Sequence, residues 1–284
     1  MTLATELTQD CPGCLGTAFL PVAGKEFLSR CRNCELVFDN PRPSPAAIND
    51  FYNQASQYDV WTGELENRNR LWARRLRKMR RHRVPGGLLD VGTGIGQFLN
   101  FARKEYSPVQ GTEVSLTAIQ HARKLYGLEI LQGTIESLQI GQQFDNVTGF
   151  HVLEHVHRPL EFLKCCYPVL KPGGRLFLAV PNDMEVLDAR IGRFSLAPIK
   201  LPTAEIHLSH FTVKSIVKLL HLSGFELIDL SVDPFWVCPL SREPLQILRY
   251  HVMGTLYRLT GSNLYPTIWA VAERPQHGGR QSSS

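Results

Sequence analysis

Residues 88–100 read LLDVGTGIGQFLN, a short apolar strand followed by a turn with glycine at three alternate positions and then by a helical pattern. In an open parallel sheet, the turn between a strand and the next helix is where backbone amides and a helix N-terminus meet a ligand. Residues 86–182 go on alternating strand and helix patterns, which is typical of βαβ units on a parallel sheet. Two further strand patterns follow at 225–232 and 265–273. The sequence therefore predicts an α/β fold with a ligand at the glycine turn.

Three kinds of ligand compete for this turn. A phosphate-binding loop needs Gly-Lys-Ser/Thr, but the first lysine after the turn is Lys104, and a dinucleotide fingerprint needs a glycine where this chain has Gln97. The strand instead ends in Asp90, whose carboxylate suits a cationic amino group. Glu113 ends the next strand, about twenty residues after the turn, where an acid can accept hydrogen bonds from both ribose hydroxyls. Both carboxylates fit an adenosine that has a zwitterionic amino-acid arm and no phosphate.

These motifs, together with HVLEHVHRPLEF and KPGGRLFLAVPN, resemble the class I S-adenosylmethionine-dependent methyltransferases over residues 84–232. HVLEHV and HLSHFTVKSIVKLLHLSGFE are most similar to the subgroup of ubiquinone-pathway O-methyltransferases. The resemblance implies a Rossmann-like, mostly parallel sheet of seven strands with helices on both faces. It also implies that S-adenosylmethionine is bound by Asp90, Gly92, Thr93, Gly94, Gly96, Glu113, Thr134, Ile135 and His151.

The resemblance assigns these residues to parts of the donor. Asp90 and the glycines line the methionine arm, Glu113 takes the ribose, and His151 lies beside the methyl group. The family often has an acid at the adenine, where this chain has Thr134 and Ile135. We therefore expect backbone atoms and the Ile135 side chain to contact the adenine.

HVLEHVH follows the fourth strand, at the sheet edge where the donor methyl should emerge. Methyl transfer to a hydroxyl needs a base, and histidine suits that role near neutral pH. We expect His155 to be the base, with Glu154 as its orienting group or as a metal ligand. The alternative is that Glu154 and His155 only cap and orient the next helix. His207 and His210, in a segment that would cover the site, are further candidates for the base.

Four of the seven cysteines form a C-x2-C-x16-C-x2-C pattern made of Cys11, Cys14, Cys31 and Cys34. This spacing predicts a four-thiolate zinc site, which has no open coordination position and is therefore structural. Metal binding would supply the folding free energy of a segment too short to build its own core. The alternative is four free thiols. The segment also resembles the N-terminal zinc modules of bacterial methyltransferases that act on sugars and other surface-glycan precursors.

Composition and patterning divide the chain into a zinc module at 1–40, a linker with helices at 41–84 and a methyltransferase domain at 85–274. Within that domain, insertions at 183–211 and 233–264 are long enough to enclose a small acceptor, and 275–284 is expected to be a disordered tail. The N-terminus lacks the pattern of a signal peptide, and no apolar run is long enough to span a bilayer. We therefore expect a cytoplasmic protein.

Three functions fit these residues. The first is transfer of a methyl group to an O, C or N atom of a small-molecule acceptor, with a sugar or glycan precursor as the candidate. The second is an RNA methyltransferase that grips its substrate with the zinc module and residues 68–83, which hold nine Lys and Arg and no acid. Outside that stretch acids outnumber Lys and Arg by 26 to 22, so a nucleic-acid partner is not expected. The third is a donor-binding partner subunit without turnover. The sequence does not indicate an oligomeric state.

Overall fold

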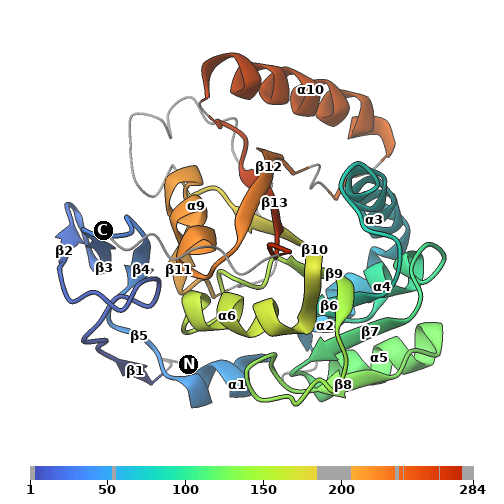
Figure 1. Cartoon of the computed structure of the whole chain (residues 1–284), viewed down its shortest axis with the longest axis horizontal. Helices are drawn as coiled ribbons and strands as arrows, with labels where there is room; N and C mark the ends of the chain where they lie inside the picture. The colour runs from blue at the N-terminus through green and yellow to red at the C-terminus, as the bar shows by residue number, and fades with distance from the viewer. Residues whose placement is uncertain are drawn as a thin grey trace.

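The computed structural model describes residues 4–52, 56–183, 206–233, 237–238, 240–261 and 263–276. Its centre is one sheet with the strand order β12-β13-β10-β9-β6-β7-β8 (Figure 1). The strands are β6 (Leu88–Val91), β7 (Val109–Glu113), β8 (Ile130–Gln132), β9 (Phe144–Phe150), β10 (Leu170–Pro181), β12 (Glu226–Val232) and β13 (Thr267–Glu273). The neighbouring strands β10, β9, β6, β7 and β8 run parallel to one another. Strand β13 runs antiparallel to both of its neighbours, β10 and β12. This confirms the predicted mostly parallel sheet of seven strands.

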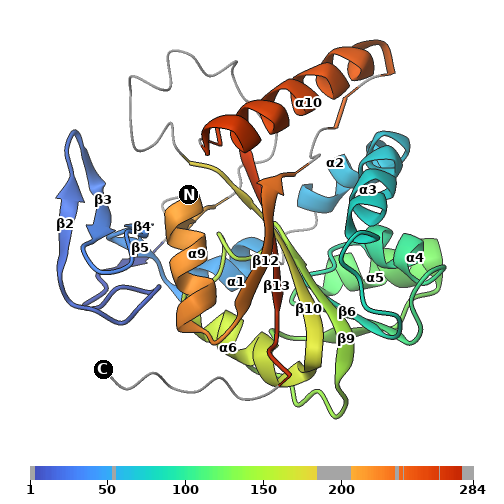
Figure 2. The same cartoon turned by 45° about the horizontal axis from the view of Figure 1, so that its top comes forward.

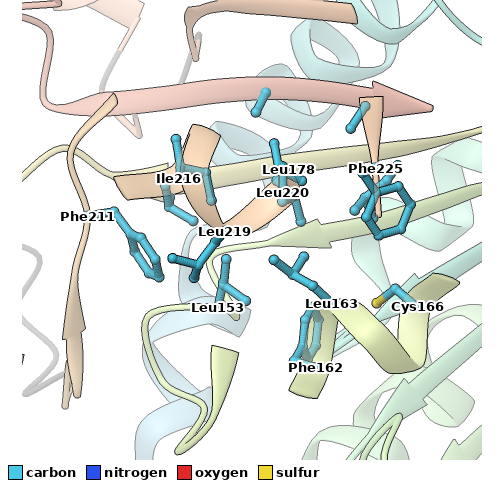
Figure 3. Packing of buried hydrophobic residues seen from close by; sticks show 14 of the residues in the cluster. Leu153, Phe162, Leu163, Cys166, Leu178, Phe211, Ile216, Leu219, Leu220 and Phe225 are labelled. Atoms are coloured by element: carbon cyan, nitrogen blue, oxygen red, sulfur yellow. The ribbon is translucent and has the colours of Figure 1, made fainter. Parts of the chain in front are cut away.

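Helices cover both faces of this sheet, as Figure 2 shows: α3, α4 and α5 lie on one face, and α6 and α9 on the other. The helices are α1 (Pro45–Tyr52), α2 (Ser56–Gly63), α3 (Leu65–Met79), α4 (Gln97–Ala102), α5 (Leu116–Tyr126), α6 (Pro159–Val169), α9 (Val213–Leu222) and α10 (Glu243–Thr260), with a short 3-10 turn, η1, at Leu240–Arg242. Each face has its own apolar core. Figure 3 shows the core on the α6 and α9 side, where Phe162 and Leu163 meet Leu219 and Leu220.

Two helix boundaries lie elsewhere than local sequence signals alone would put them. Glycine often follows the end of a helix, as Gly173 and Gly174 would in KPGG, but α6 already ends at Val169. A proline at 172 cannot continue a helix and favours extended backbone before it, so β10 already begins at Leu170. Apolar residues recur at helical intervals from Trp61 to Met79, which favours one continuous helix, whereas the chain breaks after Gly63 into α2 and α3.

The N-terminal cysteine segment forms two small sheets. Strands β1 (Thr5–Glu6) and β5 (Arg42–Pro43) pair with each other. Strands β2 (Phe19–Val22), β3 (Lys25–Cys31) and β4 (Val37–Asp39) form an antiparallel sheet. Its fourth strand, β11 (Ser209–His210), lies about 170 residues later in the sequence. Cysteines of this segment lie in the same apolar cluster as residues of α6 and α9. The module therefore packs directly on the large sheet's α6 and α9 face.

Helix α10 connects the C-terminal end of β12 to the start of β13, so it lies at the same sheet edge as the glycine turn (Figure 2). Its Gly254 is buried against β12, while an apolar row faces away from the protein and stays exposed: Leu245, Leu248, Val252, Leu256 and Leu259. No helix in the described part of the chain is long and apolar enough to cross a membrane. Of the two predicted insertions and the predicted tail, residues 184–205, 234–236, 239, 262 and 277–284 lie outside the described residues.

Candidate functional site

The glycine turn joins β6 to α4 and holds three glycines with left-handed backbone. Gly92, Gly94 and Gly96 have φ angles of 68°, 56° and 74°. A Cβ on Gly92 would lie 2.6 Å from a methyl of Val152, and one on Gly94 would lie 2.8 Å from the Trp61 ring. Both the conformation and the space therefore require glycine. The predicted Thr93 is buried between them.

Asp90 is a buried carboxylate at the C-terminal end of β6. Its Oδ1 accepts a hydrogen bond of 2.6 Å from the hydroxyl of Thr148 on β9. Burial raises the pKa of Asp90 to about 6, and the hydrogen bond from Thr148 limits the rise. A buried carboxylate held by a neutral hydroxyl is stabilised when a cationic ligand group binds it. This is the environment that the ammonium group of an amino-acid arm would relieve.

Glu113 ends β7, the strand that pairs in parallel with β6, and lies two residues beyond Gly111, the partner of Asp90. Its Oε2 accepts from the amide of Gly94 at 2.8 Å, and its Oε1 accepts from the amides of Val114 and Ser115 at 2.9 and 3.0 Å. Burial raises the pKa of Glu113, and these three amides oppose the rise. The glycine turn and the end of β7 are therefore tied together by one carboxylate.

Two aromatic residues of α2 also reach this corner, and the sequence analysis did not assign them to it. The Trp61 ring lies over Gly94 and packs against Tyr58 with the ring centroids 5.4 Å apart. Tyr58 is buried, and burial together with the charge of Glu113 raises the pKa of its phenol. The guanidinium of Arg68 lies 4.4 Å from the centroid of the Trp61 ring. Helix α2 therefore covers the predicted donor corner with aromatic side chains.

The predicted adenine contacts, Thr134 and Ile135, come directly after β8. Thr134 is exposed and closes a turn with Ser137, while Ile135 is buried in the apolar core. The amide of Gly133 donates to the carbonyl of Glu113 at 2.9 Å, which keeps this turn beside the end of β7. The turn that carries both residues is thus bonded to the end of β7, and their contact with the adenine stays a prediction.

His151 lies between two carboxylates at the C-terminal end of β9. Its φ of 56° is a strained conformation for a residue with a side chain. Nδ1 lies 3.1 Å from Oε1 of Glu154, and Nε2 lies 3.7 Å from Oδ2 of Asp233. Burial opposes the charged ring, but hydrogen bonding to Asp233 and Glu154 outweighs burial and raises the pKa of His151. A protonated His151 places a positive charge at the end of β9.

Asp233, which the sequence analysis missed, is held by Arg75 of α3. The pair is fully buried, with Nε and a terminal nitrogen of Arg75 at 3.1 and 2.5 Å from the two carboxylate oxygens. Helical spacing carried a signal for this, because Arg75 lies four residues from both Leu71 and Met79, which are buried. The basic helix α3 therefore has one arginine on its inward, buried face.

The predicted base, His155, lies beside His207 with the ring centroids 5.0 Å apart. The carbonyl of Ile206 accepts a hydrogen bond of 2.7 Å from Nδ1 of His155. A carbonyl can only accept, so Nδ1 carries the proton and Nε2 of the neutral ring has the lone pair. Nε2 lies 3.8 Å from Oε1 of Glu154. The ring of Tyr52 meets His155 edge-on at 5.9 Å.

Glu154 is completely buried at the centre of this histidine group. Burial opposes its charge, but the hydrogen bond from His151 and interactions with the neighbouring rings of His155 and His207 lower the pKa of Glu154 to about 2. Among the described residues its Oε2 has no hydrogen-bond partner. One ligand atom from each of Glu154, His155 and His207 lies within 4.8 Å of the others. Such an oxygen and nitrogen set could hold a divalent cation.

His210 is placed apart from this pair. Its Nε2 lies 3.0 Å from Oδ1 of Asp39, and its Nδ1 lies 3.3 Å from Oδ2 of Asp183. Burial would lower its pKa, but the hydrogen bonds to Asp183 and Asp39 outweigh burial and raise the pKa of His210 to about 9. A histidine with this pKa keeps its proton at neutral pH, which argues against His210 as the base.

The four predicted zinc ligands converge in the N-terminal module. The Sγ atoms of Cys11 and Cys34 are 3.5 Å apart, and those of Cys14 and Cys31 are 3.4 Å apart. All four lie within 4.8 Å of one another, and a tetrahedral zinc site places its sulfurs about 3.8 Å apart. The amide of Gly13 donates to Sγ of Cys11, a contact that favours a thiolate. The donor set therefore fits a structural zinc ion.

Comparison with known proteins agrees with this geometry. The family model described as "Methyltransferase domain" matches residues 65–230. The ubiquinone biosynthesis O-methyltransferase of Vibrio vulnificus (strain YJ016) is 35% identical over 103 residues, which are 34% of this chain and 43% of that protein. The mitochondrial ubiquinone biosynthesis O-methyltransferase of Dictyostelium discoideum is 30% identical over 190 residues, 53% of this chain and 59% of that protein. The chain thus spans about half the length of these curated relatives.

Solved structures share the fold at low sequence identity. The magnesium protoporphyrin IX methyltransferase of Synechocystis PCC 6803, solved with bound S-adenosylhomocysteine, superposes with a TM-score of 0.55 at 14% identity. That comparison covers 81% of this chain and all of the other chain. An S-adenosylmethionine-dependent methyltransferase of Clostridium acetobutylicum gives a TM-score of 0.52 at 12% identity, over 80% of this chain and 98% of the other. The resemblance seen in the motifs is confirmed by the family match, and the chain belongs to the methyltransferase domain family.

Proposed function

We propose that this protein transfers a methyl group from S-adenosylmethionine to a hydroxyl of a small molecule. The observation that carries the proposal is the pair of buried carboxylates, Asp90 and Glu113, at the ends of adjacent parallel strands on either side of a left-handed glycine turn. The pair suits the ammonium and the ribose hydroxyls of the donor, whereas a phosphate would be repelled by it. S-adenosylmethionine supplies an electrophilic methyl group on a sulfonium centre.

The histidine group supplies the base for this reaction. The acceptor oxygen attacks the methyl carbon while its proton passes to Nε2 of His155, and the sulfur leaves with the bonding electron pair as S-adenosylhomocysteine. Nδ1 of His155 already donates to the carbonyl of Ile206, so the tautomer needed for this step is fixed. Glu154 orients the histidines and stabilises the imidazolium that forms. If a divalent cation were bound by Glu154, His155 and His207 instead, it would occupy the Nε2 lone pair of His155 and would have to lower the pKa of the acceptor hydroxyl in place of that base.

The aromatic cover of the site supports a small acceptor. Tyr52, Tyr58 and Trp61 lie over the histidine and donor groups and leave an apolar and aromatic surround of the kind that stacks on small rings. A sugar or another glycan precursor is the acceptor class that this surround and the cysteine module together favour. A base such as His155 is needed because the accepting atom in this proposal is a hydroxyl oxygen, which must lose its proton.

The basic stretch gives little support to an RNA acceptor. Arg75 and Lys78 contact Asp233 and the carbonyl of Val232 inside the protein. Other members are paired at its surface: Arg70 and Arg74 with Glu243, and Arg80 and Arg83 with Glu105. Phosphate binding needs cations that are accessible and not already neutralised.

The test is calorimetric titration of the purified protein with S-adenosylmethionine and, separately, with NAD. Binding of S-adenosylmethionine alone is expected, and binding of NAD alone would overturn the proposal. Release of S-adenosylhomocysteine is then measured with a panel of nucleotide sugars, free sugars and phenols, and with bulk RNA. Release with RNA alone would replace the small-molecule acceptor, and donor binding without release under any condition would indicate a donor-binding subunit.

A further inference from the structure

We propose that the four-cysteine module positions the catalytic histidines, by holding segment 206–211 against Glu154 through strand β4, with Asp39 as the positioning residue of this contact. The role given to His155 and His207 rests on the proposed function. The position of the segment does not, because it follows from contacts between the module and the large sheet.

Segment 206–211 is held on two sides by backbone hydrogen bonds. On the module side, β11 pairs with β4 so that Ser209 lies opposite Phe38, and the amide of Asp39 donates to the carbonyl of Leu208 at 3.0 Å. On the other side, the amides of Leu208 and Ser209 donate to the carbonyl of Glu154 at 2.8 and 3.1 Å. The segment is therefore the only element described here that bonds to both β4 and the backbone of Glu154.

The same segment carries the partners of the base. The carbonyl of Ile206 fixes the Nδ1 proton of His155, and the ring of His207 packs against His155. A shift of this segment by about 1 Å would change both contacts, and displacements of this size are enough to cost roughly 100-fold in rate. The module thus contacts the segment that positions the base through one short strand, β11.

Side chains reinforce the backbone contact. His210 of β11 bridges Asp39 at the end of β4 and Asp183, which follows β10, and so joins three segments at one ring. Phe211 is completely buried, in the cluster that also contains Leu153 and Leu219 (Figure 3).

The metal-binding loops pack tightly on this side of the protein. A Cβ on Gly13 would lie 2.8 Å from Leu36, 3.2 Å from Leu219 of α9 and 3.3 Å from Sγ of Cys34. Because no space separates the cysteine loop from Leu36, which precedes β4, or from α9, a displacement of the loop would also displace β4 and α9. Loss of the metal would remove the metal–sulfur bonds that stabilise a module too small to stay folded by itself.

The two carboxylates of the donor corner are bonded by residues outside these contacts. Glu113 is bound by amides at 94, 114 and 115, and Asp90 by Thr148. Weakening the module should therefore impair turnover and leave donor binding in place. That separation distinguishes a positioning role from a general loss of stability.

The experiment compares Asp39→Ala with Asp39→Asn and with Lys218→Ala. Asn keeps an oxygen that can accept from His210. Lys218 makes another contact between α9 and the module, a 2.7 Å ion pair with Glu35, and serves as the matched control. Hydrogen exchange of segment 206–211, zinc content, donor affinity by calorimetry and the release of S-adenosylhomocysteine are measured for each variant.

For Asp39→Ala we expect exchange of segment 206–211 to quicken roughly tenfold or more, with one zinc per chain and donor affinity unchanged. Turnover should fall by roughly 10- to 100-fold with little change in the KM of the donor. Asp39→Asn should restore most of both losses, and Lys218→Ala should change neither. Removal of zinc with a chelator should quicken exchange of the same segment.

Three results would overturn the proposal: an equally protected segment in Asp39→Ala, loss of donor affinity together with the segment's protection, or the same loosening in Lys218→Ala. Hydrogen exchange needs no acceptor and no turnover. A wild-type protein that fails to bind S-adenosylmethionine would therefore contradict the proposed function while leaving this test decisive.

Discussion

The donor corner and the histidine group lie at one edge of the same sheet but are built in different ways. Both oxygens of Glu113 are bonded by amides no more than 19 residues away, within and directly after the β6-α4-β7 unit. The histidine group draws on β9, on segment 206–211 and, through a contact that spans 171 residues, on the cysteine module. One half of the site is thus formed by local structure, and the other exists only when distant segments dock.

This difference separates binding from chemistry. Local hydrogen bonds within one unit persist as long as the central sheet is folded. Contacts made by a short strand between two bodies are more easily lost, because few bonds hold them and loop-closure entropy opposes them. Changes on the histidine side should therefore affect turnover, and changes on the donor side should affect affinity.

The largest effect that would test this division is expected from His155→Ala. Loss of a general base typically lowers turnover by roughly 10² to 10⁴ fold, and donor affinity should stay nearly unchanged because no donor contact is lost. Single-turnover rates with a hydroxyl acceptor and calorimetry with the donor give the two numbers.

His207→Ala and His210→Ala are the comparison for this result. Full activity of His155→Ala on a hydroxyl acceptor, with loss in His207→Ala, would move the base to His207. An acceptor atom that loses its proton easily would show a smaller effect, so the acceptor has to be a hydroxyl.

A smaller effect of the opposite kind is expected from Glu113→Ala. Removing hydrogen bonds to a charged acceptor costs about 1.5 to 3 kcal/mol, which is about tenfold to 100-fold in donor affinity. Turnover at saturating donor should largely recover. Glu129, an exposed acid paired with Arg123 at the surface, provides the control variant Glu129→Ala, which should keep full affinity. A fall in turnover at saturating donor would mean that the two halves are coupled.

The smallest effect is a pH dependence of donor binding. The donor ammonium needs ionised Asp90, whose pKa burial raises to about 6, so affinity should fall by up to about tenfold for each pH unit below 6. Thr148→Val removes a hydrogen bond that favours the charged carboxylate, and should move the onset of this loss to higher pH. A donor affinity that stays constant from pH 7 to pH 5 would contradict the assignment.

The raised pKa of Asp90 also affects the stability of the protein without bound donor. Because the pKa of Asp90 is higher in the folded than in the unfolded state, its contribution to stability is complete below the ordinary pKa and is lost as the pH rises through about 6. Bound donor should offset that loss. Urea denaturation with and without S-adenosylmethionine, at pH 5 and pH 7, should therefore show the larger stabilisation by the donor at pH 7.

The sequence predicted the parts of the molecule whose signals are local. Short apolar runs between helical patterns located the seven strands of the large sheet, and the glycine turn with Asp90 and Glu113 was evident because its spacing is fixed by the unit that it builds. The cysteine spacing located the four-thiolate cluster for the same reason. The two-residue strand β11 has no pattern of its own, so its pairing with β4 could not be predicted.

The other missed residues depend on tertiary contacts. Trp61 and Tyr58 reach the donor corner because α2 packs over the glycine turn, and no spacing in the sequence indicates where that helix lies. Arg75 was hidden by its basic neighbours, although its helical phase with Leu71 placed it on the apolar face. A charged residue in phase with buried ones was the signal for an internal ion pair with Asp233.

The partnership of β4 with β11 also sets an order of events during synthesis. The cysteine module is synthesised before segment 206–211, because Ser209 and His210 come 171 residues after their partners Phe38 and Asp39. At roughly 5 to 20 residues per second, that interval is about 9 to 34 seconds. During this time the outer edge of β4 has no strand to pair with, and an unpaired edge is where nascent chains associate wrongly. If zinc binds before segment 206–211 is synthesised, it would keep β4 folded until β11 can pair with it.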